Sequence, residues 1–274
     1  EVAATPALPA HRWLMNEAAG VTTAADTGTS ATLAPLTLEG GAVFLGHYEG
    51  GGAVLSNPNS NNGRFLDFGG DFAFAAVGGI TFAAFVRPDS FQSWGRILYL
   101  YEFPSGSNII RLINYGTTRR AYWEINNGGT AKVLTTPAYA GDGDGASLAF
   151  FPPAGQWAHV AAVATAAYPS TYTLYRDGAT RDSTSCAGSG CNSCNGWTCA
   201  AGKPPNPSTD VTYTRAALGR YDYSGGSNSG SNYFDGALRD VRLYARALPE
   251  DEIAALAALW DPPQSPTARP SASP

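Results

Sequence analysis

The feature that most constrains this chain is a series of short apolar or alternating segments, each closed by turn-forming residues. Such segments occupy residues 80–86, 96–101, 108–115, 122–125, 157–164, 171–176 and 238–244. Clusters rich in Gly, Asn and Asp separate them, for example at 126–129 and at the hairpin-type turn Asp177-Gly178. Period-two alternation between such turns is typical of half-buried β-strands. The sequence therefore predicts an all-β chain.

One helix is expected near the C-terminus. Pro249 is followed by three acidic residues, Glu250, Asp251 and Glu252, which favour the positive end of a helix dipole. Ile253, Leu256 and Trp260 then recur at helical spacing. Because this helix follows the last predicted strand, it argues against alternating βαβ units and for two antiparallel sheets packed as a sandwich with a short C-terminal helix.

Composition excludes two classes of partner. The chain has 274 residues, a formal net charge of −5 and only two lysines, so it lacks the basic stripe of a nucleic-acid-binding protein. No apolar run approaches the length of a membrane span, so we expect no membrane insertion. The chain opens at Glu1 without an initiator Met, from which we expect a processed protein or a fragment.

All four cysteines lie in one segment rich in Gly, Ser and Asn. They are Cys186, Cys191, Cys194 and Cys199. Two disulfides would stabilise such a loop, which has no core of its own, and would indicate a secreted protein. The alternative is a four-thiolate zinc site, since Cys191 and Cys194 have ligand spacing. Three disulfide pairings are possible, and the sequence does not choose among them.

The two ends of the chain read as extensions of the domain. Residues 1–10 form an Ala- and Pro-rich lead-in, and residues 261–274 form a Pro- and Ser-rich linker or tail. Such a tail suits O-glycosylation and self-assembly along a fibre, or else is a bare flexible terminus.

Several motifs, in order along the chain, resemble a known family. The segment from Phe234 to Leu256, Gln156-Trp157-Ala158-His159-Val160-Ala161, the Leu174-to-Gly178 hairpin, the strand from Ile80 to Pro88 and the opening from His11 to Leu14 are similar to the laminin-G-like, concanavalin-A-like jelly rolls. The resemblance implies a jelly-roll domain at 11–260, with a Cys-rich insertion at about 179–210. The Ala, Gly and Arg bias with the Ser-Pro tail also resembles green-algal extracellular glycoproteins.

Catalytic residues are not evident. Glycosidases of this fold need two nearby carboxylates, usually two or four residues apart on one strand. The acids on predicted strands, Glu124 and Asp240 among them, have no such acidic partner. The resemblance implies that His159 has a structural role. We therefore predict a non-catalytic protein with no catalytic residues.

The resemblance implies a structural Ca²⁺ at the edge of the sandwich, with Asp26 and Asp240 at the matching positions. Calcium binds carboxylate and carbonyl oxygens, so both residues are candidate ligands. The alternative is an Asx-type turn at Asp26 and an ion pair between Asp240 and Arg239 or Arg242.

A glycan-binding face would use aromatic rings on exposed strand positions, together with polar partners. The candidate residues are Tyr99, Tyr101, Arg111, Trp123, Tyr221 and Tyr223, with Tyr115, Tyr122 and Glu124 beside them. Alternation separates Tyr122 from Trp123, so only one of these two rings can share such a face.

These observations predict a secreted or cell-surface module without enzymatic activity. We expect a role in structural assembly or adhesion within a glycoprotein matrix or surface fibre, and alternatively a lectin-like module that binds carbohydrate. Its partners would be extracellular glycans or glycoproteins.

Overall fold

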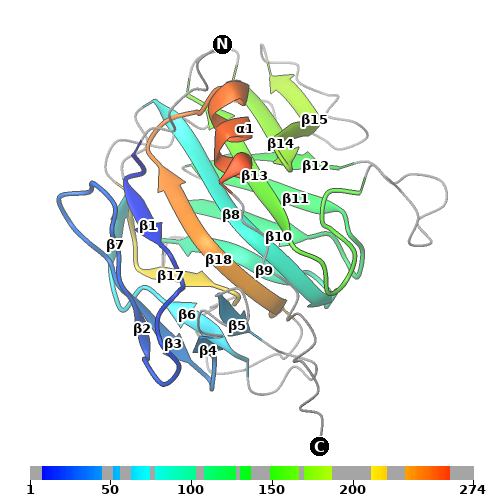
Figure 1. Cartoon of the computed structure of the whole chain (residues 1–274). Helices are drawn as coiled ribbons and strands as arrows, with labels where there is room; N and C mark the ends of the chain where they lie inside the picture. Colours follow the sequence, from blue (N-terminus) through cyan, green and yellow to red (C-terminus); the bar gives the residue numbers. More distant parts are fainter. Residues whose placement is uncertain are drawn as a thin grey trace, which may run out of the picture.

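Two large antiparallel sheets pack face to face in the computed structural model of the chain (Figure 1). The structure describes residues 8–44, 52–55, 63–74, 78–102, 108–127, 130–136, 149–166, 170–186, 211–220 and 232–259. Within these residues the architecture is a jelly-roll β-sandwich with one short helix. The prediction of an all-β sandwich with a C-terminal helix is confirmed.

The first sheet, sheet A, has the strand order β15-β14-β13-β8-β18-β5-β4, and β1 also pairs with β18. Its strands are β1 (His11–Trp13), β4 (Val43–Phe44), β5 (Ala53–Leu55), β8 (Gly79–Ser90), β13 (Ala158–Thr165), β14 (Ser170–Arg176), β15 (Ala179–Cys186) and β18 (Asp235–Tyr244). The last strand among the described residues, β18, therefore lies between β8 and β5 in the interior of the sheet.

The second sheet, sheet B, has the strand order β12-β11-β10-β9-β17-β6-β3-β2. Its strands are β2 (Thr23–Ala24), β3 (Leu36–Glu39), β6 (Phe65–Asp67), β9 (Arg96–Tyr101), β10 (Ile109–Asn114), β11 (Ala121–Asn127), β12 (Thr130–Thr135) and β17 (Arg215–Leu218). A separate pair is formed by β7 (Phe72–Phe74) and β16 (Val211–Tyr213).

The core lies between the two sheets. In sheet B, cross-strand register aligns one row of apolar side chains from β12 to β3. The row consists of Leu134, Trp123, Leu112, Leu98, Leu218, Leu66 and Leu38. Sheet A faces this row with side chains that alternate along its strands, such as Phe82, Val160 and Leu238. Both sheets thus use the period-two alternation that the sequence shows.

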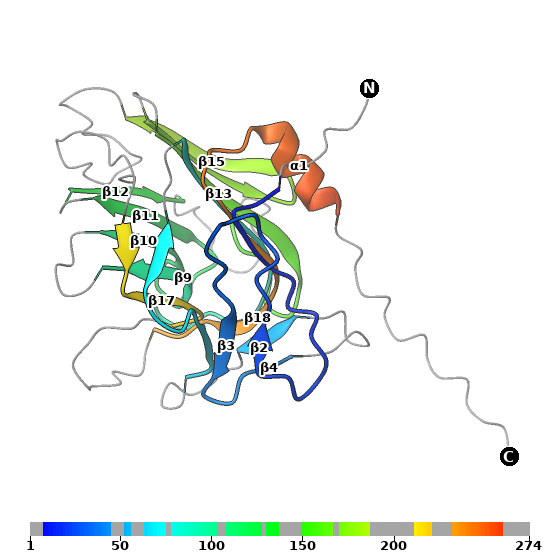
Figure 2. The same cartoon turned by 90° about the vertical axis from the view of Figure 1, so that its left-hand side faces the viewer.

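Helix α1 (Glu250–Ala258) covers the outer face of sheet A, on the far side from β10 to β12 (Figure 2). Its Ile253 and Leu256 are buried against Ala161 and Tyr175, which point away from the main core. Pro249 is the N-cap residue, and the three acids occupy the first turn, as expected. Neither α1 nor any other helix among the described residues is long and apolar enough to cross a membrane.

The prediction placed the start of the Cys-rich insertion, at about 179–210, too early in the sequence. Residues 179–186 form β15, which pairs with β14 directly after the Asp177-Gly178 turn. This segment is polar and rich in Ser and Thr, so its sequence did not indicate a strand. It forms an edge strand, and the outer side of an edge strand needs no apolar residues. The later part of the predicted insertion, the lead-in at 1–7, Trp260 and the tail at 261–274 lie outside the described residues.

Candidate functional site

The outer face of sheet B carries Tyr122 and Glu124, whereas Trp123 points into the core. The Trp123 side chain is 0% exposed and lies in the row of apolar residues that crosses the sheet. Trp123 was expected on a ligand-binding face, and its burial corrects that prediction: alternation places it with Ala121 and Ile125. The half-buried Tyr122 takes its place on the outer face.

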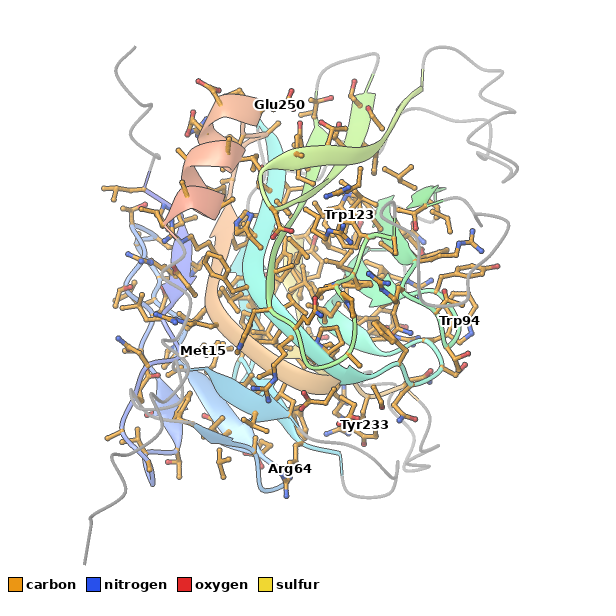
Figure 3. The ribbon with its side chains drawn as sticks, turned by 45° about the vertical axis from the view of Figure 1, so that its right-hand side comes forward. Met15, Arg64, Trp94, Trp123, Tyr233 and Glu250 are labelled. Atoms are coloured by element: carbon orange, nitrogen blue, oxygen red, sulfur yellow. The ribbon has the colours of Figure 1, made fainter. Side chains whose placement is uncertain are left out.

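Three aromatic rings meet at one end of this outer face. Trp94 lies 4.7 Å from Tyr115 and 5.9 Å from Tyr122, between ring centroids, and both pairs meet edge to face. Tyr115 and Tyr122 stack at 6.5 Å. All three rings are half-buried. In Figure 3, Trp94 lies at the margin of the molecule, on the opposite side of the view from Met15.

Two arginines complete this cluster, which we call the aromatic–arginine surface (Trp94, Tyr115, Tyr122, Arg111 and Arg120). The guanidinium of Arg120 lies 4.5 Å from the centroid of the Tyr115 ring, and that of Arg111 lies 5.4 Å from the Tyr122 ring. Arg120 also donates from Nε to the carbonyl oxygen of Thr136 at 2.7 Å. Cation–π contacts of this kind hold both the rings and the guanidinium groups in place.

The loop that presents Trp94 is fixed by hydrogen bonds. The backbone N–H of Trp94 donates to the carbonyl oxygen of Gly116 at 3.0 Å. Asn114 Nδ2 donates to the carbonyl oxygens of Gln92 and Gly116 at 2.8 and 2.5 Å, and Arg96 donates to that of Trp94. Trp94 has a φ of 59°, in the left-handed region that bulky residues rarely adopt. Surrounding contacts must maintain such a conformation, which is common at binding sites.

An ion pair lies beside the three rings. Arg111 donates from Nε and Nη2 to Glu124 Oε2 at 2.8 and 2.5 Å. Burial, and then the negative charge of Glu124, raise the pKa of Tyr122 to about 12. Tyr122 is therefore a neutral phenol at physiological pH, and the Arg111 guanidinium stays charged. Among the residues that the structure describes, this surface offers ring faces and hydrogen-bond donors, and Glu124 has no second carboxylate beside it for acid–base catalysis.

Two other predicted ligand residues share this outer face but are buried. Tyr99 pairs across the strands with Arg111, as the prediction of a common face requires. Tyr99 and Tyr101 stack at 5.8 Å, yet they are only 1% and 7% exposed. Neither ring is therefore accessible to a ligand, which corrects the prediction that Tyr99 and Tyr101 lie on an exposed binding face. Tyr221 and Tyr223 lie outside the described residues.

Sequence reasoning missed Trp94 and Arg120 as site residues. Neither residue lies on a predicted strand, so the period-two pattern could not predict the direction of either side chain. The available signal was a tryptophan within the polar segment Gln92-Ser93-Trp94-Gly95, because a large ring in a short polar connection has no core position to fill.

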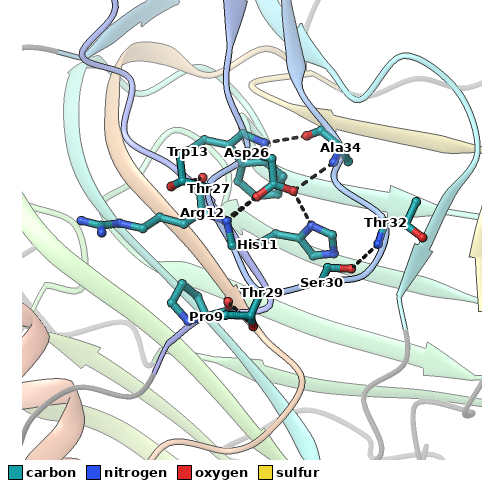
Figure 4. Close-up of polar contacts among 11 residues, drawn as sticks. Pro9, His11, Arg12, Trp13, Asp26, Thr27, Thr29, Ser30, Thr32 and Ala34 are labelled. Carbon is teal, nitrogen blue, oxygen red and sulfur yellow. Dashed lines mark hydrogen bonds and ion pairs between the residues drawn. The ribbon is translucent and has the colours of Figure 1, made fainter.

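The candidate calcium ligand Asp26 is surrounded by N–H donors (Figure 4). Its carboxylate accepts hydrogen bonds from the backbone N–H groups of Arg12, Gly28 and Ala34 at 2.9 to 3.0 Å. His11 Nδ1 lies 2.6 Å from Asp26 Oδ2. Burial alone would raise the pKa of Asp26, but these hydrogen bonds hold it below its usual value. The bond from Gly28 is the Asx-type turn that was the alternative to calcium.

The second candidate ligand, Asp240, is held between two arginines. Arg12 Nε and Arg242 Nε each donate to Asp240 Oδ1 at 2.9 Å, and the Nη2 atoms of both arginines bond Oδ2. Burial opposes ionisation of Asp240, yet the two arginines lower its pKa. The ion pair with Arg242 is the alternative that was expected, with Arg12 as an unforeseen partner.

The described part of the structure gives little evidence for or against the predicted metal site and the predicted disulfides. In the described ranges, no three His, Cys, Asp or Glu side chains come together in a way that could hold a metal ion. Cys186 ends β15, and Cys191, Cys194 and Cys199 lie outside the described residues. The disulfide prediction therefore stays a prediction.

Fold and site together define a class: an antiparallel jelly roll with an aromatic surface on the outer face of one sheet. The Laminin_G_3 family, described as the concanavalin A-like lectin/glucanases superfamily, matches residues 49–220. The chain belongs to this family. No curated protein sequence matches the chain.

Solved structures share the fold at low sequence identity. Domain 4 of AbnA, a GH43 extracellular arabinanase from Geobacillus stearothermophilus in complex with arabinotriose, is similar with a TM-score of 0.56 and 14% identity, covering 92% of this chain and 100% of that one. The receptor binding domain of botulinum neurotoxin type G has a TM-score of 0.57 and 12% identity, covering 92% and 51%. The binding domain of botulinum neurotoxin serotype D/C reaches 0.59 at 12% identity, covering 92% and 52%. The chain thus spans about half the length of these toxin domains.

Proposed function

We propose that this domain is a non-catalytic, lectin-like module that binds extracellular carbohydrate through the aromatic–arginine surface. The observation that carries the proposal is the cluster of Trp94, Tyr115 and Tyr122, three half-buried rings in mutual contact and flanked by Arg111 and Arg120. Ring faces contact the apolar C–H faces of sugars, and guanidinium and phenol groups bond their hydroxyls.

Preorganisation supports this proposal. The Trp94 loop is tied to Asn114 and Gly116, and Arg111 is held by Glu124, so a ligand would order few additional side chains on binding. A surface that is already ordered loses less conformational entropy when it binds. Structures with this fold include one in complex with arabinotriose and the receptor binding domain of botulinum neurotoxin type G, and both are consistent with a binding role.

Glycan-array binding followed by calorimetry tests the proposal. The unmodified domain is expected to bind a defined subset of neutral or acidic oligosaccharides. Tyr122→Ala and Trp94→Ala should each weaken that binding about tenfold or more, equivalent to ~1.4 kcal/mol. Val43→Ala, which removes an exposed apolar side chain from β4, is the matched control and should bind as the parent does. Binding that is equal in all four proteins would place the glycan site elsewhere.

We further propose that the module acts outside the cell as part of a larger glycoprotein assembly. The Ser- and Pro-rich sequence of residues 261–274 and the four clustered cysteines support this context. Mass spectrometry of the unreduced native protein should find two disulfides. Alkylation of all four cysteines before reduction would refute the disulfides, and a bound zinc ion would favour the thiolate site.

A further inference from the structure

A hollow lies on the outer face of sheet A, on the other side of the sandwich from the aromatic–arginine surface. It occupies about 570 Å³ between α1, β13 and the turn that joins β14 to β15. Its walls include Phe85, Trp157, His159, Asp177, Gly178 and Ala257. This volume falls within the range of small-molecule pockets.

Small residues create the hollow. A Cβ atom on Gly178 would lie 3.0 Å from the Cα of Ala254 and 3.4 Å from the Cβ of Ala257. The turn therefore packs closely on the helix at Gly178, whose φ of 78° also favours glycine. Ala254, Ala257 and Ala258 lie at i, i+3 and i+4, so one face of α1 presents only methyl groups to the pocket.

The charged groups next to the pocket wall are held in ion pairs, Asp177 with Arg176 and, over the Trp157 ring, Arg87 with Asp89. His159 is 4% exposed, and its Nδ1 is buried without a hydrogen-bond partner. Burial, and then the nearby charge of Arg242, lower the pKa of His159 to about 3, so its ring is uncharged. The Asp177 carboxylate lies 3.6 Å from the guanidinium of Arg176, which balances its charge, and it accepts the backbone N–H of His159 at 3.0 Å.

We propose that this pocket binds an uncharged, hydroxylated ring, such as one neutral monosaccharide unit, independently of the aromatic–arginine surface. The half-buried Trp157 supplies apolar ring surface for a sugar face, with the Arg87 guanidinium 5.5 Å from its ring centroid, and the buried Phe85 packs behind it against His159. The Asp177 carboxylate, whose side chain is 58% exposed, accepts hydrogen bonds from hydroxyl groups, and the buried, uncharged His159 ring forms part of the pocket wall. A full ionic charge would find no net opposite charge here.

Indole N–H signals from ¹⁵N-tryptophan-labelled protein distinguish the two sites. Trp157→Phe and Trp94→Phe assign the reporter signals. The probes are the methyl glycosides of glucose, galactose and arabinose, with methyl glucuronoside as the charged control. At least one neutral probe should shift the Trp157 signal in a saturable way, and the glucuronoside should bind at least fivefold more weakly.

Filling the pocket should abolish that response. Ala257→Phe places a ring in the hollow, and Ala258→Trp blocks it from an exposed position if the first variant folds poorly. Ala255→Phe is the matched control, since Ala255 does not line the pocket. The inference is overturned if no neutral probe shifts Trp157, or if the shift persists in a folded, filled variant. A shift of Trp94 alone would support the proposed function and reject this second site.

Discussion

At the scale of single residues, adjacent side chains on β11 have opposite roles. Trp123 fills the core between the sheets, and Tyr122 forms part of an accessible surface. The strand could be predicted from its sequence, and alternation required that the two rings separate. Which ring faced outward depended on the register with β10 and β12, where Leu112 and Leu134 flank Trp123. This register is set by the tertiary fold, so the sequence of β11 alone does not determine which of the two rings faces outward.

Truncating each of these rings should therefore give opposite results. Trp123→Ala should lower the free energy of unfolding by about 3–5 kcal/mol, because it leaves a cavity in the core. Tyr122→Ala removes a half-buried ring with two ring contacts, so it should cost less, about 1–2 kcal/mol, but weaken glycan binding. Urea unfolding of both variants measures the difference. Trp123→Phe should recover much of the loss, since the indole Nε1 has no hydrogen-bond partner. Equal stabilities for the two alanine variants would contradict the assignment of faces.

Titration of His159 makes a prediction about pH. Its pKa is lowered from 6.5 to about 3 in the folded protein by burial first and then by Arg242. Between these values the unfolded chain binds the proton and the folded chain does not, so stability falls as pH decreases from about 6.5 toward 3. At pH 5 this residue should account for a loss of about 2 kcal/mol relative to pH 7.

Comparing His159→Gln with the parent isolates this contribution. The variant should lose less stability between pH 7 and pH 5 in urea unfolding, whatever its stability at pH 7. Parallel pH dependences in the two proteins would show that another group dominates acid sensitivity.

At the scale of secondary-structure elements, β1 and β18 are joined by both backbone pairing and charge. Register places Arg12 opposite Arg242, and Asp240 bonds both side chains. Asp240 sits in a bulge of β18 with a φ of 46°, which directs its carboxylate between the two arginines. The strands themselves were predictable from alternation, but a bulge shifts the register by local geometry that a period-two pattern does not contain.

Removing the charge of Asp240 should weaken the association of β1 with β18. Asp240→Asn retains a residue type that tolerates positive φ, but it leaves two neighbouring arginines uncompensated. We expect a loss of about 2–3 kcal/mol in the free energy of unfolding, by analogy with broken buried ion pairs. Asp89→Asn, which disturbs the more exposed pair with Arg87, is the control and should cost less than about 1 kcal/mol. A neutral effect of Asp240→Asn would mean that backbone pairing alone holds β1.

Calcium addition tests the other prediction made for Asp26 and Asp240. N–H donors already bond the oxygens of both carboxylates, and a calcium ion would have to displace them. Melting temperatures in millimolar Ca²⁺ and in EDTA should therefore agree within about 1 °C. A rise of several degrees with Ca²⁺, lost in Asp26→Asn, would instead establish the site that the family resemblance implies.

At the scale of the whole molecule, the sandwich presents two separate surfaces, one on each sheet. The aromatic–arginine surface lies on sheet B, and the pocket beside α1 lies on sheet A. Because the core fills the space between them, a domain with both sites could bridge two glycan chains. The fold class could be predicted from the ordered motifs. The pocket could not, because it depends on how closely a hairpin turn and a helix approach each other.

Deleting residues 264–274 tests where the domain ends. The sequence there has no large apolar side chain, so deletion should leave the melting temperature unchanged. Leu256→Ala, which removes a buried contact of α1, is the positive control and should cost about 2 kcal/mol or more. A large decrease on deletion would show that the tail belongs to the folded domain.

The interior position of β18 also bears on how the protein can be made. During synthesis β8 emerges long before residues 235–244, yet β18 is one of its two partners in the sheet and the partner of β1 and β5 as well. A nascent chain must therefore hold long, unpaired strand edges until residues 235–244 have been synthesised, which is the condition under which strands of different chains associate. Premature stop codons before residue 235 should yield aggregates rather than a smaller domain, and slow release from the ribosome should favour chaperone binding.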